Sequence, residues 1–490
     1  MLQTDTFVID PVHTPGLIHA ANLTEESAKT TEELLKENHE KYHIFFTVED
    51  HMGVSLTVST CQTDQLSSRR PQVYLHNHIA HHDLTLWALG AKPEVLKSQH
   101  DRNALYMRDA MIVVEPLVQD LEDDVIFKRC LGKEEHFRNF EQFFLNQITQ
   151  KGYQAVLQKY LVGGGDVADD MLFRIYMADP DLTHAGYVHG LIHICLALEF
   201  RQPLLLAEGL AQAAVHHDNW YTEYLSAAEA LAKEAKETPL PLATIVDMER
   251  QDPKISTASS LDYHTQTRKH SGRWAMDKEM ARDGVLGNAK DELVRLAARW
   301  RVDPDDLDRA TAELINTAVY ITAGAQRPPY QCAFDFFLLH CATASIGHVS
   351  FLKEESMTKE QKARLLEYSG RVLMMTYAGM GTPQLHLDYL CSHRSKLPNQ
   401  GWAEVFERAC LHEDDGHLSK MIRSTKLAQE ISKPYDHLPE FRVKQDMFLT
   451  AAIAMIDSGT SQPMTWTKHW DFIRGAGFPG AWERFPQRDY

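Results

Sequence analysis

Apolar residues recur at three- and four-residue spacings along most of this 490-residue sequence, whereas strictly alternating stretches are scarce. Such spacing gathers apolar side chains on one face of a helix. It predicts helices over nine segments, residues 76–90, 186–200, 204–216, 284–300, 334–350, 361–380, 401–411, 416–431 and 448–457. We therefore predict an all-α fold. No unit of about 20–50 residues recurs, so we expect one large helical domain over residues 1–490 rather than a regular solenoid.

Two short segments depart from the helical pattern. Residues 44–48 and 54–58 alternate well enough to be strands, which predicts one small hairpin near the N-terminus. Residues 249–272 are rich in Ser, Thr, Asp and Lys and carry few aliphatic side chains. We expect a loop, a lid or a domain boundary there.

The charge balance limits the partners of the chain. Fifty Lys and Arg against 68 Asp and Glu give a net charge of −18, which argues against binding to nucleic acid or to an anionic membrane. No stretch approaches the roughly 18 apolar residues of a membrane helix, and the N-terminus lacks the regions of a secretory signal. Seven widely spaced cysteines without a C-x-x-C motif indicate free thiols. We expect a soluble, cytoplasmic protein with small-molecule partners.

Histidine is the unusual residue, because its 26 copies outnumber the 25 glycines. His78 and His82 stand at i and i+4, the spacing that lets two imidazoles on one helix bind one metal ion, and His81 points to the other side of His78. A polar helix face with solvated histidines is the alternative. The apolar continuation at residues 84–90 favours burial, and a buried histidine needs a partner.

Two further apolar segments carry histidines. His189 and His193 repeat the i, i+4 spacing in a segment that is apolar on all sides and therefore interior. His340 lies in a third apolar segment whose one carboxylate is Asp335. Backbone carbonyls, water or ordinary core packing would account for each alone, but the joint pattern predicts a metal site.

A fourth segment, residues 412–423, adds an acidic pair, a histidine and a lysine. Asp414 or Asp415 suits a helix N-cap, with Gly416 permitting the sharp turn, and His417 and Lys420 then share a face. A lysine ammonium has no lone pair for a metal. A buried lysine with a lowered pKa can instead add carbon dioxide and become a carboxylate.

The remaining motifs give little support for other kinds of binding site. Residues 475–480 match G-x-G-x-x-G but lack the following helix and acidic residue, and residues 162–166 form a helix-terminating turn rather than a P-loop. A di-iron oxygenase would need two E-x-x-H motifs, and only Glu40 and His43 offer one. A helical interaction protein without enzymatic activity remains a further alternative.

The sequence resembles the questin oxidase-like family. The resemblance rests on residues 77–82 with 86–91, residues 189–193 with 197–200, residues 336–340, and residues 414–417 with Lys420 and Arg423, which together span most of the chain. Asp83 stands where a leucine-like residue is expected, and Gly190 where proline is common.

The resemblance implies an all-helical, oxygen-dependent enzyme of fungal secondary metabolism that cleaves a C–C bond of an anthraquinone-type polyketide ring. Oxygen attack beside the quinone carbonyl would give a benzophenone-type acid. For ring-cleaving members it implies non-haem iron(II) held by four histidines and a carboxylated lysine, and for others Baeyer–Villiger oxidation with NADPH. Carried onto this chain, the expected ligands are His78, His82, His193, His340 and carboxylated Lys420, with His189, His81 and His417 in reserve.

The remaining expected site residues concern the substrate. Lys420, His417 and Arg423 are the expected catalytic residues, and either Arg423 or Lys426 would pair with a phenolate of the substrate. Four aromatic side chains are candidates to stack on its planar rings, although core packing also explains them: Trp87, Tyr187, Phe336 and Phe337. The oligomeric state is not legible from the sequence.

Overall fold

A computed structural model describes residues 6–47, 74–176, 187–216, 220–259, 276–459 and 472–490. The predicted all-α fold is confirmed, because almost every element in these ranges is a helix. The nine predicted helices all form: α3 (Ile79–Ala88), α10 (His189–Glu199), α11 (Pro203–Val215), α16 (Gly287–Ala297), α18 (Phe336–Ser345) with α19 (His348–Leu352), α20 (Lys359–Gly379), α22 (Trp402–Leu411), α23 (His417–Ser432) and α24 (Met447–Gly459).

Further helices fill the intervals between the predicted ones. They are α1 (Glu25–Lys41), α4 (Pro93–Ala104), α5 (Glu115–Asp120), α6 (Asp124–Cys130), α7 (Phe137–Lys151), α8 (Tyr153–Leu157), α9 (Asp166–Arg174), α12 (Trp220–Glu234), α13 (Leu242–Gln251), α14 (Ile255–Ala258), α17 (Leu307–Gly324) and α21 (Leu387–Cys391). Short π-helical stretches cover Gln158–Val162 and Met276–Leu286, and 3-10 turns cover Glu134–His136, Lys433–Tyr435 and Pro479–Ala481.

The predicted hairpin is half right. Strand β1 (Phe45–Thr47) falls inside the first predicted segment, but its antiparallel partner is β2 (Tyr74–His76), with Phe45 opposite His76. Residues 54–58 lie outside the described residues. The polar stretch from residue 249 begins with the end of α13 and with α14, and residues 260–272 are likewise outside the description.

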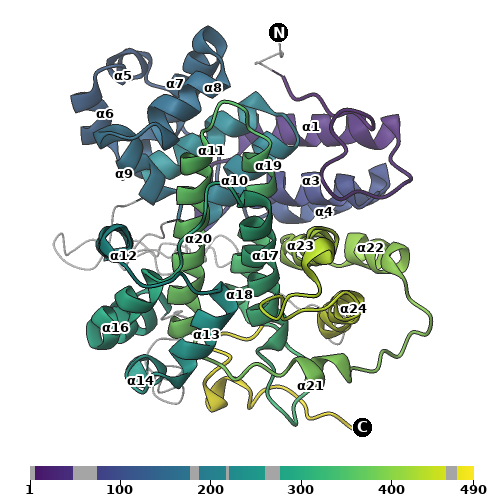
Figure 1. Cartoon of the computed structure of the whole chain (residues 1–490). Coiled ribbons are helices and arrows are strands. Elements are labelled where there is room, and N and C mark those ends of the chain that lie inside the picture. The colour runs from purple at the N-terminus through teal and green to yellow at the C-terminus, as the bar shows by residue number, and fades with distance from the viewer. Residues whose placement is uncertain (1–5, 48–73, 177–186, 217–219, 260–275, 460–471) are drawn as a thin grey trace, which may run out of the picture.

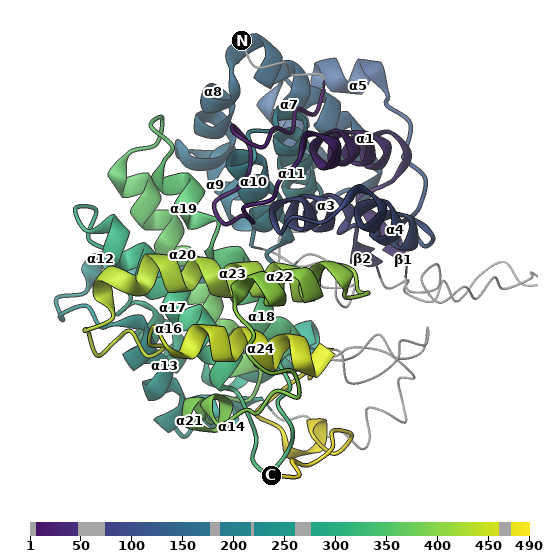
Figure 2. The same ribbon diagram turned by 90° about the vertical axis from the view of Figure 1, so that its right-hand side faces the viewer.

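Four helices from distant parts of the sequence enclose a common interior. Helix α3 packs against α10, α10 against α18, α18 against α23, and α23 closes the ring by packing against α3. Figures 1 and 2 show α10, α17, α18 and α20 at the centre, with α1, α3 and α4 above α22, α23 and α24. The ring therefore joins the N-terminal helices to the C-terminal ones.

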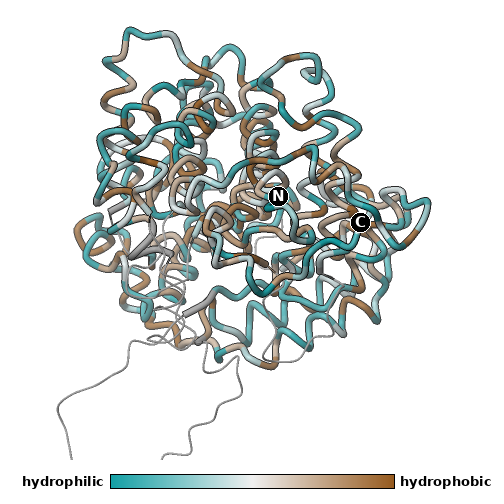
Figure 3. The backbone as a smooth tube through the Cα atoms, turned by 90° about the horizontal axis from the view of Figure 1, so that it is seen from below, coloured by the Kyte–Doolittle hydropathy of each residue, from teal (hydrophilic) through white to brown (hydrophobic). Residues whose placement is uncertain are grey.

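Burial of apolar side chains stabilises this arrangement. One connected core includes buried residues from Phe7 to Trp482. Figure 3 shows hydrophobic and hydrophilic residues alternating along most helices, as expected where each helix buries one face. Among the described residues, no helix is both long and apolar enough to cross a membrane.

Candidate metal centre

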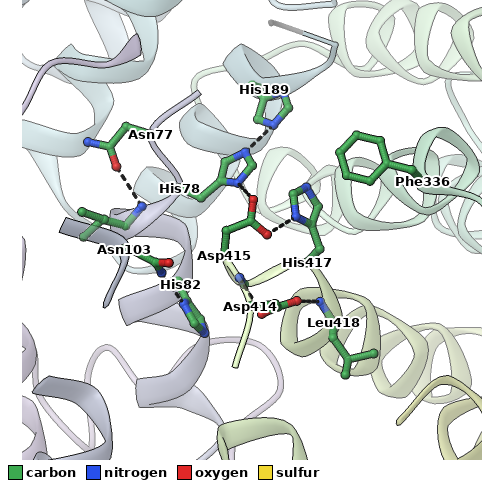
Figure 4. Close-up of polar contacts among 12 residues, drawn as sticks. Asn77, His78, His82, Asn103, His189, Phe336, Asp414, Asp415, His417 and Leu418 are labelled. Carbon is green, nitrogen blue, oxygen red and sulfur yellow. Dashed lines mark hydrogen bonds and ion pairs between the residues drawn. The ribbon is translucent and has the colours of Figure 1, made fainter. Parts of the chain in front are cut away.

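The four-helix ring brings imidazoles from four separate segments together. His78 precedes α3, His189 begins α10, His340 lies in α18 and His417 begins α23. One ring nitrogen from each of His78, His189 and His417 lies within 4.8 Å of the others. The Nε2 atoms of His78 and His189 are 2.7 Å apart (Figure 4). Those of His417 and His340 are 3.2 Å apart. All four side chains are buried.

Aspartate side chains stabilise the starts of α18 and α23. Asp414 accepts hydrogen bonds from the backbone N–H groups of Gly416 and Leu418. The N-cap residue of α23 is Gly416, however, and not the predicted Asp414 or Asp415. Gly416 has φ = 93°, and a Cβ there would lie 2.8 Å from a ring atom of His82, so only glycine fits. Asp335 caps α18 and also accepts from Gly475 and Ala476 rather than contacting His340.

Asp415 joins two of the imidazoles. Its Oδ2 accepts a hydrogen bond from His78 Nδ1 at 3.0 Å, and its Oδ1 accepts one from His417 Nδ1. Partial burial opposes the ionisation of Asp415, but electrostatic attraction to His417 and His78 and these two hydrogen bonds hold its pKa well below its usual range. Since a carboxylate only accepts, both Nδ1 atoms carry a proton, and in the neutral ring Nε2 keeps a lone pair.

The contact between His340 and His417 then lacks a proton. His340 Nδ1 donates to the carbonyl oxygen of Phe336, so neutral His340 also has a bare Nε2. Burial holds the pKa of His340 well below 6.5 and keeps it neutral. Two lone pairs would face each other at 3.2 Å unless a cation, either a second proton on His417 or a metal ion, joins them. The geometry of this pair therefore fits a shared proton or a metal ion between the two Nε2 atoms.

Lys420 lies one helical turn beyond His417. Its Nζ is buried and has no hydrogen-bond partner within the described part of the chain. Burial lowers its pKa to about 8, against the opposing effect of Asp415 and Asp414. Its charge is near enough to contribute to the lowered pKa values of His78, His81, His82, His189 and His340. The amine therefore lies near enough to these imidazoles to affect them electrostatically.

His82 and His193, two of the expected ligands, point elsewhere. His82 Nδ1 accepts from the amide of Asn103 at 3.0 Å, so its proton lies on Nε2 (Figure 4). His193 uses both nitrogens, Nε2 toward Glu208 at 3.1 Å and Nδ1 toward His81 at 3.0 Å. The lone pair of each ring therefore faces a neighbouring side chain, that of Asn103 for His82 and that of His81 for His193. The structure instead brings the reserve residues His189 and His417 to His78 and His340.

Glu208 forms a second group with His39 and Glu141, also within 4.8 Å of one another. Its carboxylate binds His193 on one side and His39 on the other, and Arg138 pairs with Glu141. The hydrogen bond to Glu208 raises the pKa of His39 to about 9, although burial opposes the charge. Each carboxylate of this group has a protein partner, although burial raises the pKa of Glu141 to about 7.

The comparisons with known proteins bear on this geometry. A sequence profile described as questin oxidase-like matches residues 75–425. The chain belongs to the questin oxidase-like family. It is 32% identical to oxidoreductase AflY of Aspergillus parasiticus, across 96% of this chain and 92% of that protein. It is 31% identical to questin oxidase of Aspergillus fumigatus, across 96% and 97%, and 30% identical to Baeyer-Villiger oxidase ptaJ of Pestalotiopsis fici, across 96% of each.

The family resemblance drawn from the four histidine-bearing blocks is thereby confirmed, and this questin oxidase-like chain is an oxidoreductase. Its two departures from the family pattern have local explanations. Asp83 is buried and accepts from His100 Nδ1 at 2.9 Å. Gly190 packs closely on Ile175, the residue that follows α9. A Cβ at position 190 would lie 3.2 Å from the Ile175 Cα atom.

One expected phenolate partner, Arg423, is already paired in this questin oxidase-like chain. Its guanidinium forms a buried two-point ion pair with Glu199 and donates from Nε to the carbonyl of Ile18 at 3.0 Å. A charge neutralised in this way is poorly suited to bind a substrate anion. These contacts join α23 to α10 and to the N-terminal segment.

Only one of the four candidate aromatic residues is well placed for a substrate. Trp87 is fully buried and donates to the carbonyl of Thr14, and Tyr187 hydrogen-bonds to Thr376 in the core. Phe337 is also buried. Phe336 is only partly buried, and its ring centroid lies 4.7 Å from that of His340 and 4.8 Å from that of His417. Figure 4 shows it beside His417.

Sequence reasoning assigned Asp415 only to capping and did not single out Glu208. Glu208 did leave a signal, because it is the one charged residue in the apolar helix α11. A buried carboxylate without a partner is costly, so a lone glutamate in such a helix indicates a buried cation or hydrogen-bond donor nearby. The double role of Asp415 had no signal, since it depends on how α23 meets α3.

Proposed function

We propose that this chain is a mononuclear non-haem iron oxygenase that uses O2 to cleave a ring C–C bond of an anthraquinone-type polyketide in fungal secondary metabolism. The contact of two bare Nε2 atoms, those of His340 and His417, carries the metal part of this proposal. The names of the relatives, questin oxidase among them, support the oxidative part.

The donor set suits iron. His78, His189, His340 and His417 would hold the ion through imidazole nitrogens, which are common ligands of iron in proteins. This set replaces His82 and His193 because the nitrogens of His78, His189 and His417 lie within 4.8 Å of one another and His340 adjoins His417. When bound, iron(II) would supply the electron transfer that lets O2 react with a closed-shell organic molecule.

Lys420 is the proposed fifth ligand, after carboxylation. Its buried amine has a pKa near 8, so an appreciable fraction is uncharged at neutral pH and able to add CO2. A cavity of about 20 Å³ adjoins Lys420, lined also by Thr85, Ile192, Cys195, Thr343 and Ser424. About 10–15 Å³ by this measure holds one water-sized molecule, so the cavity has room for a small adduct.

The organic substrate would approach from the side of Asp415 and Phe336. The Asp415 side chain is 34% exposed, whereas that of His417 behind it is 3% exposed. Phe336 offers a partly exposed ring beside His340 and His417 for stacking on a planar quinone. Arg474 lies over the Phe336 ring, with 4.3 Å between the guanidinium carbon and the ring centroid, and adds positive charge at this edge.

A Baeyer–Villiger reaction with NADPH is the second candidate, because relatives carry that name. It would insert one oxygen atom next to the carbonyl and reduce the other to water with the electrons of NADPH. Nothing in the described residues restores the dismissed glycine motif, since residues 479–481 form a 3-10 turn rather than a helix. NADPH would therefore bind in another way.

One experiment separates these reactions. Purified protein is incubated under ¹⁸O₂ with hydroxylated anthraquinones and with their two-electron-reduced hydroquinones, and O2 use, NADPH use and product labelling are measured. Dioxygenation of the hydroquinone gives the benzophenone-type acid with two labelled atoms and no use of NADPH, whereas the Baeyer–Villiger reaction of the quinone gives one labelled atom and consumes one NADPH. Absence of O2 consumption by iron-loaded protein with every anthraquinone would refute the proposed substrate class.

A further inference from the structure

The Asp415 side chain contacts residues at the starts of two helices, α3 and α23, that are far apart in the sequence. Its neighbour Asp414 accepts from two backbone N–H groups and fixes the start of α23. The Asp415 side chain therefore does not cap α23 and can accept hydrogen bonds from other side chains. Its two oxygens bind His78, before α3, and His417, at the start of α23, 337 and 2 residues away in the sequence.

We infer that Asp415 is a positioning residue that fixes the proton of both His78 and His417 on Nδ1, and so turns both Nε2 lone pairs toward the shared interior. One carboxylate can accept from two imidazoles at once, whereas an amide of the same shape can accept from one and must donate toward the other. Carboxylates that orient the ligand histidines of metal sites act in this way.

The partners of each Nε2 make this assignment consequential. With its proton on Nδ1, His78 presents a lone pair to His189, whose own Nδ1 has no partner among the described residues and can give up its proton to Nε2. His417 presents a lone pair to His340. The ring proton of His340 is on Nδ1, which donates to the carbonyl oxygen of Phe336. If the proton of His417 moved to Nε2, it would satisfy His340 and remove one ligand atom from the group.

The inference builds on the proposed metal centre, but its first test needs no metal. In chelator-treated protein carrying ¹⁵N-histidine, ring-nitrogen chemical shifts report which nitrogen bears hydrogen, and His78→Gln and His417→Gln assign the two signals. We expect a protonated Nδ1 in both rings of the wild type. A bare Nδ1 in either ring overturns the inference, whatever the metal content.

Two matched variants of the same loop complete the test. Asp415→Asn should free the Nδ1 proton of one of the two histidines and weaken Fe²⁺ binding by about 10- to 100-fold. Asp415→Glu should restore both protonated Nδ1 atoms and part of the affinity. Asp414→Asn changes a carboxylate of equal size one residue away, so it should lower thermal stability and leave both histidine signals and Fe²⁺ affinity unchanged.

The outcomes are distinct for the two proposals. Unchanged histidine signals and Fe²⁺ affinity in folded Asp415→Asn would refute the role of Asp415. A wild type that binds no Fe²⁺ but shows the expected histidine signals, altered in Asp415→Asn, would refute the metal centre and leave the role of Asp415 in setting the two protons intact.

Discussion

The Nε2 atoms of His340 and His417 face each other at 3.2 Å, while Phe336 and Asp415 hold the proton of each ring on its far side. A metal ion would remove the resulting repulsion. We therefore expect about one iron per chain by elemental analysis. Chelation should lower the melting temperature and abolish O2 consumption, and added Fe²⁺ should restore both, because an ion bound only by the folded state stabilises it.

A buried histidine outside the group provides the control for this prediction. His348 lies in α19 and binds Ser369 at 2.6 Å. His348→Ala should retain iron, whereas His340→Ala and His417→Ala should lose most of it. His76 is a less suitable control, because its ring stacks on that of His189 with centroids 4.4 Å apart. Full turnover by metal-free protein would contradict the prediction.

The choice between the two ligand sets is testable by substitution. The family resemblance favours His82 and His193, whereas the hydrogen bonds favour His189 and His417. We expect His189→Ala and His417→Ala to reduce iron content by more than half, and His82→Ala and His193→Ala to reduce it less. Iron analysis of the four purified variants decides, and the reverse order would restore the original assignment.

The helical fold was predictable because its signal is local. The three- and four-residue spacing identified all four helices of the ring, which are α3, α10, α18 and α23. The pairing of β1 with residues 74–76 was not predicted, since these two strands are far apart in the sequence. Local alternation identifies a strand but does not identify its partner.

The histidine blocks were also predictable, but not the orientation of each ring. Spacing at i and i+4 placed His78 beside His82, yet His78 precedes the helix. Asn103, from α4, donates a hydrogen bond to His82 Nδ1. Which nitrogen keeps a lone pair depends on partners from other helices, such as Glu208 for His193. Contacts between distant segments leave no periodic trace in the sequence.

Substrate binding should depend on Phe336 more than on the buried aromatic residues. Phe336→Ala removes a stacking ring, worth about 0.5–1.5 kcal/mol, and should raise KM for the anthraquinone about 2- to 10-fold with iron content unchanged. Trp87→Phe should leave KM unchanged but destabilise the fold by about 1–3 kcal/mol, because the hydrogen bond to Thr14 and packing are lost. An effect of Trp87→Phe on KM alone would reverse the assignment.

The pair of His39 and Glu208 should make stability depend on pH. The folded-state pKa of His39 is raised to about 9, above its unfolded value near 6.5. The pair therefore contributes fully below about pH 6.5, and the contribution is lost as pH rises toward 9. Denaturant unfolding should show His39→Gln less stable than wild type by about 1–3 kcal/mol at pH 6, with a smaller difference at pH 9. A constant difference would contradict the prediction.

Lys420 gives the most demanding prediction. Because its pKa is lowered to about 8, the free amine that captures CO2 becomes more abundant as pH rises from 7 to 9. Reconstitution with Fe²⁺ should therefore improve across this range and with added bicarbonate. Lys420→Met keeps an unbranched buried chain without an amine, so it should lose the bicarbonate response and most of the iron. Lys420→Glu should recover part of the iron by supplying a shorter carboxylate. A crystal structure of active, iron-loaded protein with an unmodified Lys420 amine would refute carboxylation and leave the four imidazoles as the proposed protein ligands.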